Sequence, residues 1–311
     1  TISPGSHYGV FHPIEGPVVN TVTGDHYYSI QAAIDAASAG DTINVAAGTY
    51  LETGQIVIDK DLTIVGADRT TTIIKPAQDT TASGDGRGWF LVQSGVQFDL
   101  SNVTLDGSGH LVYQAIRHLG SGTIDNVTFT HILYNESGPT YSGVSIAAFG
   151  AANVNVTNSL FDNIGRIGIL YYGAGQTGTF SNNTYTGKGD GDWLDYALDV
   201  SAGAVVTISG NTMTDCTGVA SSDGSTSAGI LVTTYYGPNT QATITSNMIS
   251  NNTTGIAVGY DASDTSIVVA HSNNISGNTA YGVTSTEPAV DVEENWWGSA
   301  SGPSGEGPGS G

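Results

Sequence analysis

Four aspartates close together form the densest acidic cluster of the sequence. Asp190, Asp192 and Asp195 lie in a stretch that contains glycine, and Asp199 follows shortly after them. Oxygen ligands at such short spacing suit Ca²⁺, so Asp190, Asp192 and Asp195 are predicted calcium ligands, although the twelve-residue calcium-loop pattern is absent. Paired carboxylates are also what glycoside hydrolysis requires, so Asp192, Asp195 and Asp199 are candidate catalytic groups. A solvated loop is the alternative for the whole cluster.

Aromatic residues gather in the same part of the chain. Tyr172, Trp193, Tyr196, Tyr235 and Tyr236 lie on or after a series of short apolar segments. Aromatic rings can stack on the faces of sugars while their polar edges contact water. These five residues are therefore predicted to bind a polysaccharide or other glycan, with the alternative that some of them only cover the flank of the fold.

The elements that must position these residues follow from two repeated phrases. The first phrase contains Asn, Ser or Thr and ends in an apolar residue, as in Asn182-Asn-Thr-Tyr185 and Ser246-Asn-Met-Ile249, and it returns every 22 to 36 residues. The second follows it, as in Gly229-Ile-Leu-Val232. Both alternate apolar and polar residues over a few positions, which is typical of short strands with one buried face. Such a repeat buries a core only by stacking on its neighbours, so we expect an all-β, parallel β-helix of about nine or ten coils.

Within this fold the second phrase is expected to present one row of side chains to solvent. When the segment Gln114–His118 is aligned with the phrases that begin at Gly143 and Gly168, this row is predicted to consist, in order, of Arg117, Ser145, Leu170, Asp199, Leu231 and Ala257. Neighbouring coils lie about 4.8 Å apart, so Arg117 and Asp199, three coils apart, are separated by roughly 14 Å. They are too far apart to act on one bond, but a chain of sugars could contact both.

Asparagine recurs at the same place in the first phrase. The residues are Asn183, Asn211, Asn247, Asn273 and Asn295. Asparagine tolerates left-handed backbone geometry and can pass side-chain hydrogen bonds from one coil to the next. We expect a structural ladder at the corners of the coils.

The ends of the chain differ from its middle. Residues 1–26 carry three prolines and no clear periodicity, and they predict an extended lead-in. Apolar residues from Ile30 onward then follow a helical period, with Ser29 as the cap and Gly40 at the end. This short helix is expected to cap the β-helix domain, predicted at residues 27–300. Residues 301–311 are rich in Gly, Pro and Ser and predict a linker, with the possibility of further domains after residue 311.

The opening and the close of the β-helix region carry a resemblance. The opening reads Tyr28-Ser-Ile-Gln-Ala-Ala-Ile-Asp-Ala-Ala-Ser-Ala-Gly-Asp-Thr-Ile-Asn-Val-Ala-Ala-Gly-Thr-Tyr50, followed by Leu62-Thr-Ile-Val-Gly66, and the close reads Glu294-Asn-Trp-Trp-Gly-Ser-Ala-Ser-Gly-Pro303. Together with the repeats between them, these segments resemble right-handed parallel β-helix proteins of the pectin-lyase-like superfamily. The resemblance covers roughly residues 27–303. This architecture hosts lyases, hydrolases, epimerases and non-catalytic surface modules.

The resemblance implies a set of possible activities. Lyases of the superfamily commonly use an Arg or Lys to take the proton beside a uronate carboxylate, with Ca²⁺ or basic groups neutralising that carboxylate. Arg117 is the candidate base by this resemblance, although an ordinary surface ion pair is the alternative for it. The Asn-Thr-Asp and Gly-His-Gly phrases that mark β-helix galacturonan hydrolases do not occur together here. The resemblance thus implies a secreted or cell-surface polysaccharide-recognising module, either a polysaccharide lyase or glycoside hydrolase or, alternatively, a non-catalytic structural or adhesive unit of a stalk or filament.

The charge of the chain limits its partners. The 311 residues contain 7 Lys and Arg against 28 Asp and Glu, a net charge of −21. Binding duplex nucleic acid needs a basic face, so nucleic acid is not an expected partner. Membrane insertion is not expected either, because no apolar run approaches the length of a span. An acidic polysaccharide would be repelled unless a cation or a local basic group intervened.

Overall fold

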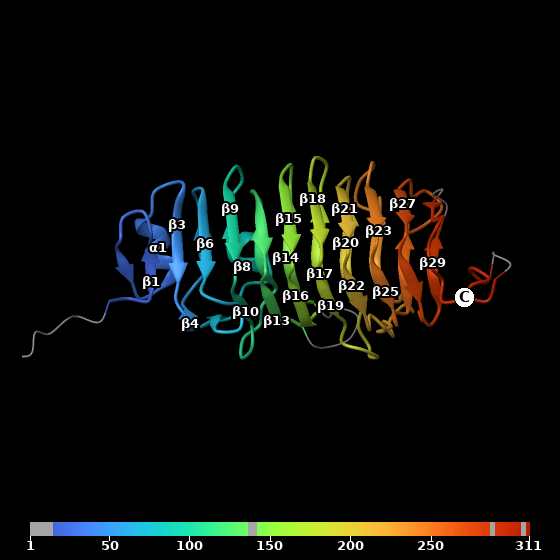
Figure 1. Ribbon diagram of the computed structural model, residues 1–311, viewed down its shortest axis with the longest axis horizontal. Helices are drawn as coiled ribbons and strands as arrows, with labels where there is room; N and C mark the ends of the chain where they lie inside the picture. Colours follow the sequence, from blue (N-terminus) through green and yellow to red (C-terminus); the bar gives the residue numbers. More distant parts are fainter. Residues whose placement is uncertain (1–14, 136–141, 287–289, 306–308) are drawn as a thin grey trace, which may run out of the picture.

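The chain forms one elongated stack of coils. The computed structural model describes residues 15–135, 142–286, 290–305 and 309–311. Figure 1 shows the coils following one another along the long axis, from β1 at one end to β29 at the other. Three parallel sheets run the length of the stack, and each coil contributes one short strand to each sheet in turn. The fold is therefore the all-β parallel β-helix that the repeated phrases predict.

The three sheets are called A, B and C here. Sheet A has twelve strands, in the order β2 (His26–Tyr27), β1 (Val18–Asn20), β3 (Asp41–Val45), β6 (Leu62–Gly66), β9 (Gln97–Ser101), β12 (Ser121–Asp125), β15 (Asn153–Thr157), β18 (Thr177–Ser181), β21 (Val205–Ser209), β24 (Gln241–Thr245), β27 (Ile267–His271) and β30 (Val290–Asp291). Sheet B has nine, namely β4 (Gly48–Glu52), β7 (Thr72–Pro76), β10 (Thr104–Asp106), β13 (Thr128–Ile132), β16 (Leu160–Ile164), β19 (Thr184–Thr186), β22 (Thr212–Thr214), β25 (Met248–Ser250) and β28 (Asn274–Ser276). Sheet C also has nine, namely β5 (Ile56–Ile58), β8 (Gly88–Val92), β11 (Gln114–His118), β14 (Val144–Phe149), β17 (Ile167–Tyr172), β20 (Tyr196–Ser201), β23 (Ala228–Thr233), β26 (Thr254–Val258) and β29 (Tyr281–Ser285). Nine strands in each of the last two sheets agree with the nine or ten coils expected.

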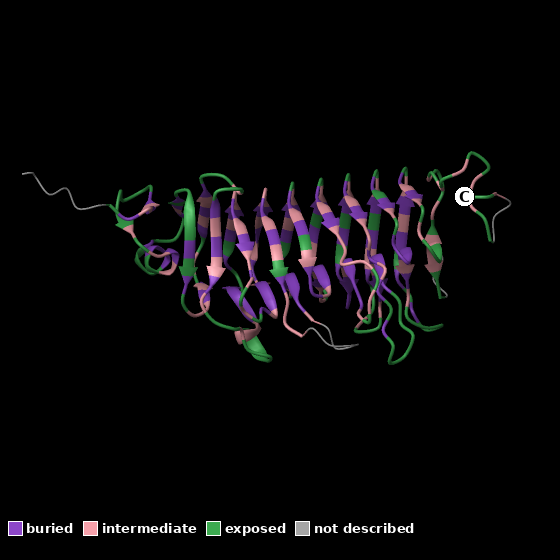
Figure 2. Ribbon diagram, turned by 90° about the horizontal axis from the view of Figure 1, so that it is seen from below, coloured by how far each residue is buried: buried purple, intermediate pink, exposed green. Residues whose placement is uncertain are grey.

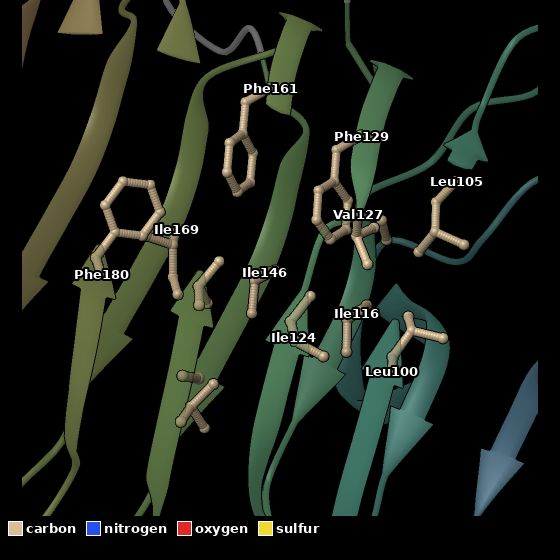
Figure 3. Close-up of a cluster of buried hydrophobic side chains, with 14 of the residues drawn as sticks. Leu100, Leu105, Ile116, Ile124, Val127, Phe129, Ile146, Phe161, Ile169 and Phe180 are labelled. Atoms are coloured by element: carbon tan, nitrogen blue, oxygen red, sulfur yellow. The ribbon is translucent and has the colours of Figure 1, made fainter. Parts of the chain in front are cut away.

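The core is a continuous apolar column inside the coils. Figure 2 shows buried residues alternating with less buried ones along many of the strands, and Leu62–Gly66 alternates buried and half-buried residues, so one face of the strand points inward. Like side chains stack from coil to coil: the rings of Phe129 and Phe161 lie 5.0 Å apart and nearly parallel, and Phe180 follows at 5.7 Å (Figure 3). Each coil thus buries its apolar residues against the next one, which is why a single repeat could not fold alone.

The asparagine ladder is present, but its backbone geometry differs from the prediction. The side-chain oxygen of Asn247 accepts hydrogen bonds from the backbone and side-chain nitrogens of Asn211 (3.0 and 2.8 Å). The backbone and side-chain nitrogens of Asn247 donate in the same way to the side-chain oxygen of Asn273 (2.9 and 2.9 Å). The left-handed residues are the ones just before the ladder, such as Asn182 and Ser246, with φ of 56° and 57°. The left-handed turn therefore aims the next side chain along the axis, and the ladder residue itself is buried.

The first end of the stack is closed by a helix and a hairpin. Helix α1 (Ile30–Ala36) begins at Ser29, whose hydroxyl accepts a hydrogen bond from the Ala32 backbone nitrogen at 3.1 Å. The helix ends at Ala36, earlier than the predicted stop at Gly40, with Ala37 as its cap. It is the one α-helix among the described ranges, and no described helix is long and apolar enough to cross a membrane.

Part of the predicted lead-in is ordered as strands. Residues 1–14 lie outside the described part, but β1 and β2 pair with each other, and β1 pairs antiparallel with β3. The end of sheet A is therefore a hairpin rather than an extended segment.

A 3₁₀ turn, η1 (Gly84–Arg87), lies later in the chain, just before β8.

The register of sheet C corrects the predicted row of exposed residues. Arg117 pairs with Ala147, and Ile116 pairs with Ile146, so Ser145 does not belong to the row. Ile146 stacks on Ile169, which places Ser145 beside Gly168. The prediction was wrong because it aligned Gly143 with Gly168, whereas the fold stacks the large aliphatic residues on one another.

Candidate functional site

The candidate site lies on the outer face of sheet C. The corrected row, in register from β11 to β26, consists of Arg117, Ala147, Leu170, Asp199, Leu231 and Ala257. Asp199 is the one carboxylate in this row, between two leucines. Arg117 and Asp199 stand three coils apart, as predicted, so they do not form one reacting pair.

An aromatic strip runs along one edge of this face. It consists of Phe149, Tyr172, Tyr236, Tyr235 and Tyr260, each at or just after the carboxyl end of a sheet C strand. Ring centroids along the strip are 5.2, 5.6, 4.7 and 4.3 Å apart in that order. Tyr235, Tyr236 and Tyr260 are more than half exposed. Four coil steps separate β14 from β26, so the strip extends over roughly 19 Å, with Phe149 and Tyr172 half-buried at one end.

Asp199 has an altered acidity because of where it sits. Its carboxylate is half-buried and accepts a hydrogen bond from the Ser201 hydroxyl. Burial raises the pKa of Asp199 to about 6, although the Ser201 hydrogen bond and the charge of Arg166 act in the opposite direction. A carboxyl with a pKa near 6 can exchange a proton near neutral pH, which is a property of acid and base groups in enzymes.

Arg166 is the cation that acts on Asp199. It precedes β17, and its charge partly offsets the rise that burial causes in the pKa of Tyr196. Its Nε is enclosed and has no hydrogen-bond partner within the described part of the chain. Burial, followed by the charge of Asp199, raises the pKa of the Tyr236 hydroxyl. Asp199, Arg166 and Tyr236 thus influence one another, and they link this half-buried row, in which Ala147 is fully buried, to the aromatic strip.

Arg117, the predicted base, is held by other groups. Its Nε donates to the Asp85 carboxylate at 2.8 Å, and its guanidinium lies 4.8 Å from the centre of the Phe149 ring. Asp85 comes from η1, in the preceding coil. Arg117 therefore stands at one end of the aromatic strip as a paired cation.

Asp195 lies inside the fold. Its carboxylate accepts hydrogen bonds from the Tyr185 hydroxyl and the Lys188 backbone nitrogen, and the Lys188 ammonium lies 3.3 Å away. Neither side chain of this ion pair is appreciably exposed. Asp195 is therefore not placed to meet a polysaccharide or a solvent cation.

The three predicted calcium ligands are not brought together. Asp190 and Asp192 are exposed, and Asp192 accepts hydrogen bonds from the backbone nitrogen and hydroxyl of Ser221, both at 2.8 Å. Asp195 faces the interior. Over residues 15–135, 142–286, 290–305 and 309–311, no three His, Cys, Asp or Glu side chains group as metal ligands.

Two of the predicted aromatic binders are covered. Tyr196 is buried, its hydroxyl donates to the Thr226 carbonyl at 3.3 Å, and burial raises its pKa to about 12. Trp193 is half-buried, with its Nε1 donating to the Gly189 carbonyl at 3.2 Å. Tyr196 belongs to a second apolar cluster outside the main core, formed with Leu194 and Ala220 from the covering loops. The aromatic residues that remain exposed are the ones after the strands.

The structure also contains polar groups that the sequence interpretation did not identify as functional. Arg166 is one of them, although it is one of only seven Lys and Arg residues in the sequence. A cavity between sheets B and C gathers His110, His131 and Asp79, which no repeat marked. One signal was available: His131 occupies a left-handed corner that Asn163 and Asn251 occupy in later coils. A histidine at a position that later coils fill with Asn, Gly or Asp could have indicated the site.

Comparison with known proteins identifies the fold. A family model described as "Right handed beta helix region" matches residues 86–296. A search of curated protein sequences finds no match. The A-module of the mannuronan C-5 epimerase AlgE4 from Azotobacter vinelandii is similar in structure, with a TM-score of 0.60, 16% identity, and coverage of 89% of this chain and 74% of that chain. The PL6 family alginate lyase AlyGC gives a TM-score of 0.56 at 15% identity. The match to AlyGC covers 86% of this chain but only 38% of that one. At such identities the likeness concerns the fold.

Proposed function

Because the chain belongs to the right-handed β-helix family, we propose that it is a polysaccharide-recognising module of the cell exterior that holds a glycan along the aromatic strip. The observation that carries this proposal is the unbroken line of rings from Phe149 to Tyr260. Stacked on sugar faces, exposed rings bury apolar area while their hydroxyls contact sugar hydroxyls and water. A line of several rings suits a polymer better than a single sugar.

The similar structures support the class of ligand. The epimerase is named for mannuronan and the lyase for alginate, both polysaccharides. The basic groups beside the strip, Arg166 and Arg117, would lower the repulsion that a net charge of −21 imposes on an acidic chain. We therefore include both neutral and uronate polymers among the expected ligands.

The reacting group, if the module is a lyase or hydrolase, is proposed to be Asp199. Its pKa near 6 allows it to accept or donate a proton, and Arg166 supplies a positive charge on the same face. The alternative, a non-catalytic structural or adhesive module, is favoured by the engagement of Arg117 with Asp85 and of Asp195 with Lys188. Two of the four predicted catalytic groups are occupied in this way.

The binding proposal is tested by removing two neighbouring exposed rings of the strip, Tyr235 and Tyr236. Tyr235→Ala combined with Tyr236→Ala should weaken binding to any polysaccharide that the parent retains, by roughly thirty-fold if each ring contributes about 1 kcal/mol. Affinity electrophoresis or calorimetry on a panel of neutral and uronate polymers measures this. Tyr28→Ala is the matched control, because Tyr28 is equally exposed but precedes α1 at the far end of the stack.

Binding and turnover separate the alternatives. If the parent and the double variant bind a polymer equally well, or if neither binds any polymer, the proposed role of the strip in binding is contradicted. Asp199→Asn should abolish any bond cleavage while leaving affinity largely intact, as measured by release of new chain ends. A parent that binds but releases no new ends on any polymer supports the non-catalytic module.

A further inference from the structure

A cavity of about 400 Å³ lies where sheet B turns toward sheet C, at the coils of β10 and β13. Its polar walls come from Asp79, His110 and His131, and its apolar walls come from Leu111 and Leu133. The loop that carries His110 leads into β11, so the cavity adjoins the amino ends of the sheet C strands. The aromatic strip lies at their carboxyl ends and begins one coil later, at β14. The two places are separate.

Two imidazole–carboxylate pairs face this cavity. Nδ1 of His110 lies 3.0 Å from Asp79 Oδ1, which also accepts the Leu111 backbone nitrogen at 2.9 Å. Nδ1 of His131 lies 3.0 Å from Asp106 Oδ1. In both rings the carboxylate occupies Nδ1, so Nε2 is the nitrogen left for a ligand, and no described residue bonds to it.

Lys75 and Ser108 hold the carboxylate of the second pair, His131 and Asp106, in place. The Asp106 carboxylate accepts the Ser108 backbone nitrogen at 3.0 Å and lies 3.1 Å from the Lys75 ammonium, which also donates to the Ser108 hydroxyl at 2.6 Å. Burial alone would raise the pKa of Asp106, but the hydrogen bonds from Ser108 and Lys75 hold it below its usual value. The carboxylate therefore stays charged and keeps His131 in one orientation.

The backbone around the cavity is also closely fitted. A Cβ atom on Gly107 would stand 2.4 Å from the His131 carbonyl oxygen, so glycine is required where the two loops approach. His131 has φ of 54°, a left-handed conformation. The backbone that carries His131 is therefore preformed, while the side chains of His110, His131 and Asp79 are 31%, 45% and 54% exposed.

Charge and ligand count restrict what can enter. The carboxylates of Asp79 and Asp106 outnumber the one ammonium of Lys75, which opposes an anion. A metal ion would need more ligands than the two ring nitrogens, and the described residues offer no group of three. Sugar hydroxyls both donate and accept, so they can pair with Nε2 and with carboxylate oxygens, while the leucines contact the ring carbons.

We propose that this cavity binds a single neutral sugar ring, separately from the polymer on the aromatic strip. A volume of about 400 Å³ is near the lower end for ligand pockets, which fits one ring rather than an oligosaccharide. This site goes beyond the polysaccharide proposal and does not depend on it. A terminal or branching sugar of a glycan is the natural occupant.

The test titrates the folded chain with glucose, galactose, mannose and xylose, followed by saturation-transfer NMR and calorimetry. Asp79→Asn and His131→Asn remove one acceptor each, and asparagine tolerates the left-handed position of His131, so the fold should persist. His271→Asn is the matched control, because His271 forms an equivalent pair with Asp291 at 2.7 Å in the last coils, outside the cavity.

At least one of the four sugars should bind with millimolar affinity, and either cavity variant should weaken it about ten-fold. His271→Asn and the Tyr235/Tyr236 double variant should bind it as the parent does, which separates this site from the aromatic strip. Binding of none of the four sugars would overturn the proposal. Binding of glucuronate, inorganic phosphate or zinc in place of the neutral sugars, or equal loss in the His271 variant, would overturn it as well.

Discussion

Asp199 illustrates how one residue's surroundings set its chemistry. The same side chain that lies in a row of leucines and alanines has its pKa raised to about 6 from 3.8 by burial. A carboxyl with a raised pKa stabilises the folded state fully below its unfolded pKa, and this stabilisation is lost as the pH rises through 6. The folded chain should therefore carry a penalty at neutral pH that it lacks under mildly acidic conditions.

Replacing Asp199 by asparagine should remove that penalty. Between about pH 4 and pH 7 the free energy of unfolding of the parent, relative to Asp199→Asn, should fall by on the order of 2 kcal/mol. Urea unfolding at a series of pH values measures it. Asp162→Asn, on the exposed outer face of sheet B, is the control. A difference that stays flat across this pH range would show that Asp199 ionises as an exposed carboxyl does.

Single residues also show where sequence interpretation ends. Tyr235 and Tyr236 were correctly expected after a strand, since periodicity fixes where a strand stops, and they are indeed exposed. Asp195 looked like its neighbour Asp192 in the sequence, yet it turns inward to Lys188. The partner of Arg117 is Asp85, 32 residues away in a loop whose path no repeat encodes. Pairings of this kind depend on loop conformation, which local pattern does not determine.

At the scale of elements, the asparagine ladder ties successive coils together. Asn247 donates to the Ile208 and Thr245 carbonyls, both at 3.0 Å, besides its bonds to the ladder residues on either side. The Asn247 side chain and the backbone nitrogen of Asn211 are buried, so removing the side chain leaves that nitrogen without its acceptor. The ladder is therefore expected to contribute strongly to stability.

Asn247→Ala should destabilise the chain by about 2–4 kcal/mol, because several buried hydrogen-bonding groups lose their partners at once. Thermal or urea unfolding followed by circular dichroism provides the measurement. Asn153→Ala is the comparison, since Asn153 is exposed on sheet A and its side chain bonds only to the side chains of Thr177 and Asn155 within the described contacts. Equal losses in the two variants would mean that the buried ladder adds nothing beyond an ordinary surface contact.

The elements themselves were largely predictable. Alternation and Gly or Asn corners gave the strands, and Ser29 marked the start of α1. The register within sheet C was not predictable to the residue, because the segment around Ser145 offers two alignments that differ by two positions and keep the same side of the strand. Stacking of Ile146 on Ile169 decides between them.

At the scale of the molecule, charge is the dominant feature. Residues 189–311 contain no Lys or Arg, so the later coils repel one another along the stack. Raising NaCl from about 0.1 M to about 1 M shortens the screening length from about 10 Å to about 3 Å. The melting temperature should rise by several degrees as this repulsion is screened. Calorimetry in NaCl and KCl measures it, and a melting temperature that is unchanged or lower in both salts would contradict the expectation.

The antiparallel strand at the first end of the stack constrains how such a chain can lengthen. In the later coils, each strand of sheet A forms the same parallel hydrogen-bonding pattern with the strands on either side of it. A duplicated coil could therefore be inserted between two such coils without changing the pairing of the adjacent strands. Ahead of β3 the pattern is that of β1, which runs the opposite way. Length changes by tandem duplication are therefore confined to the positions beyond β3, and the aromatic strip is free to grow by whole coils while the hairpin stays fixed.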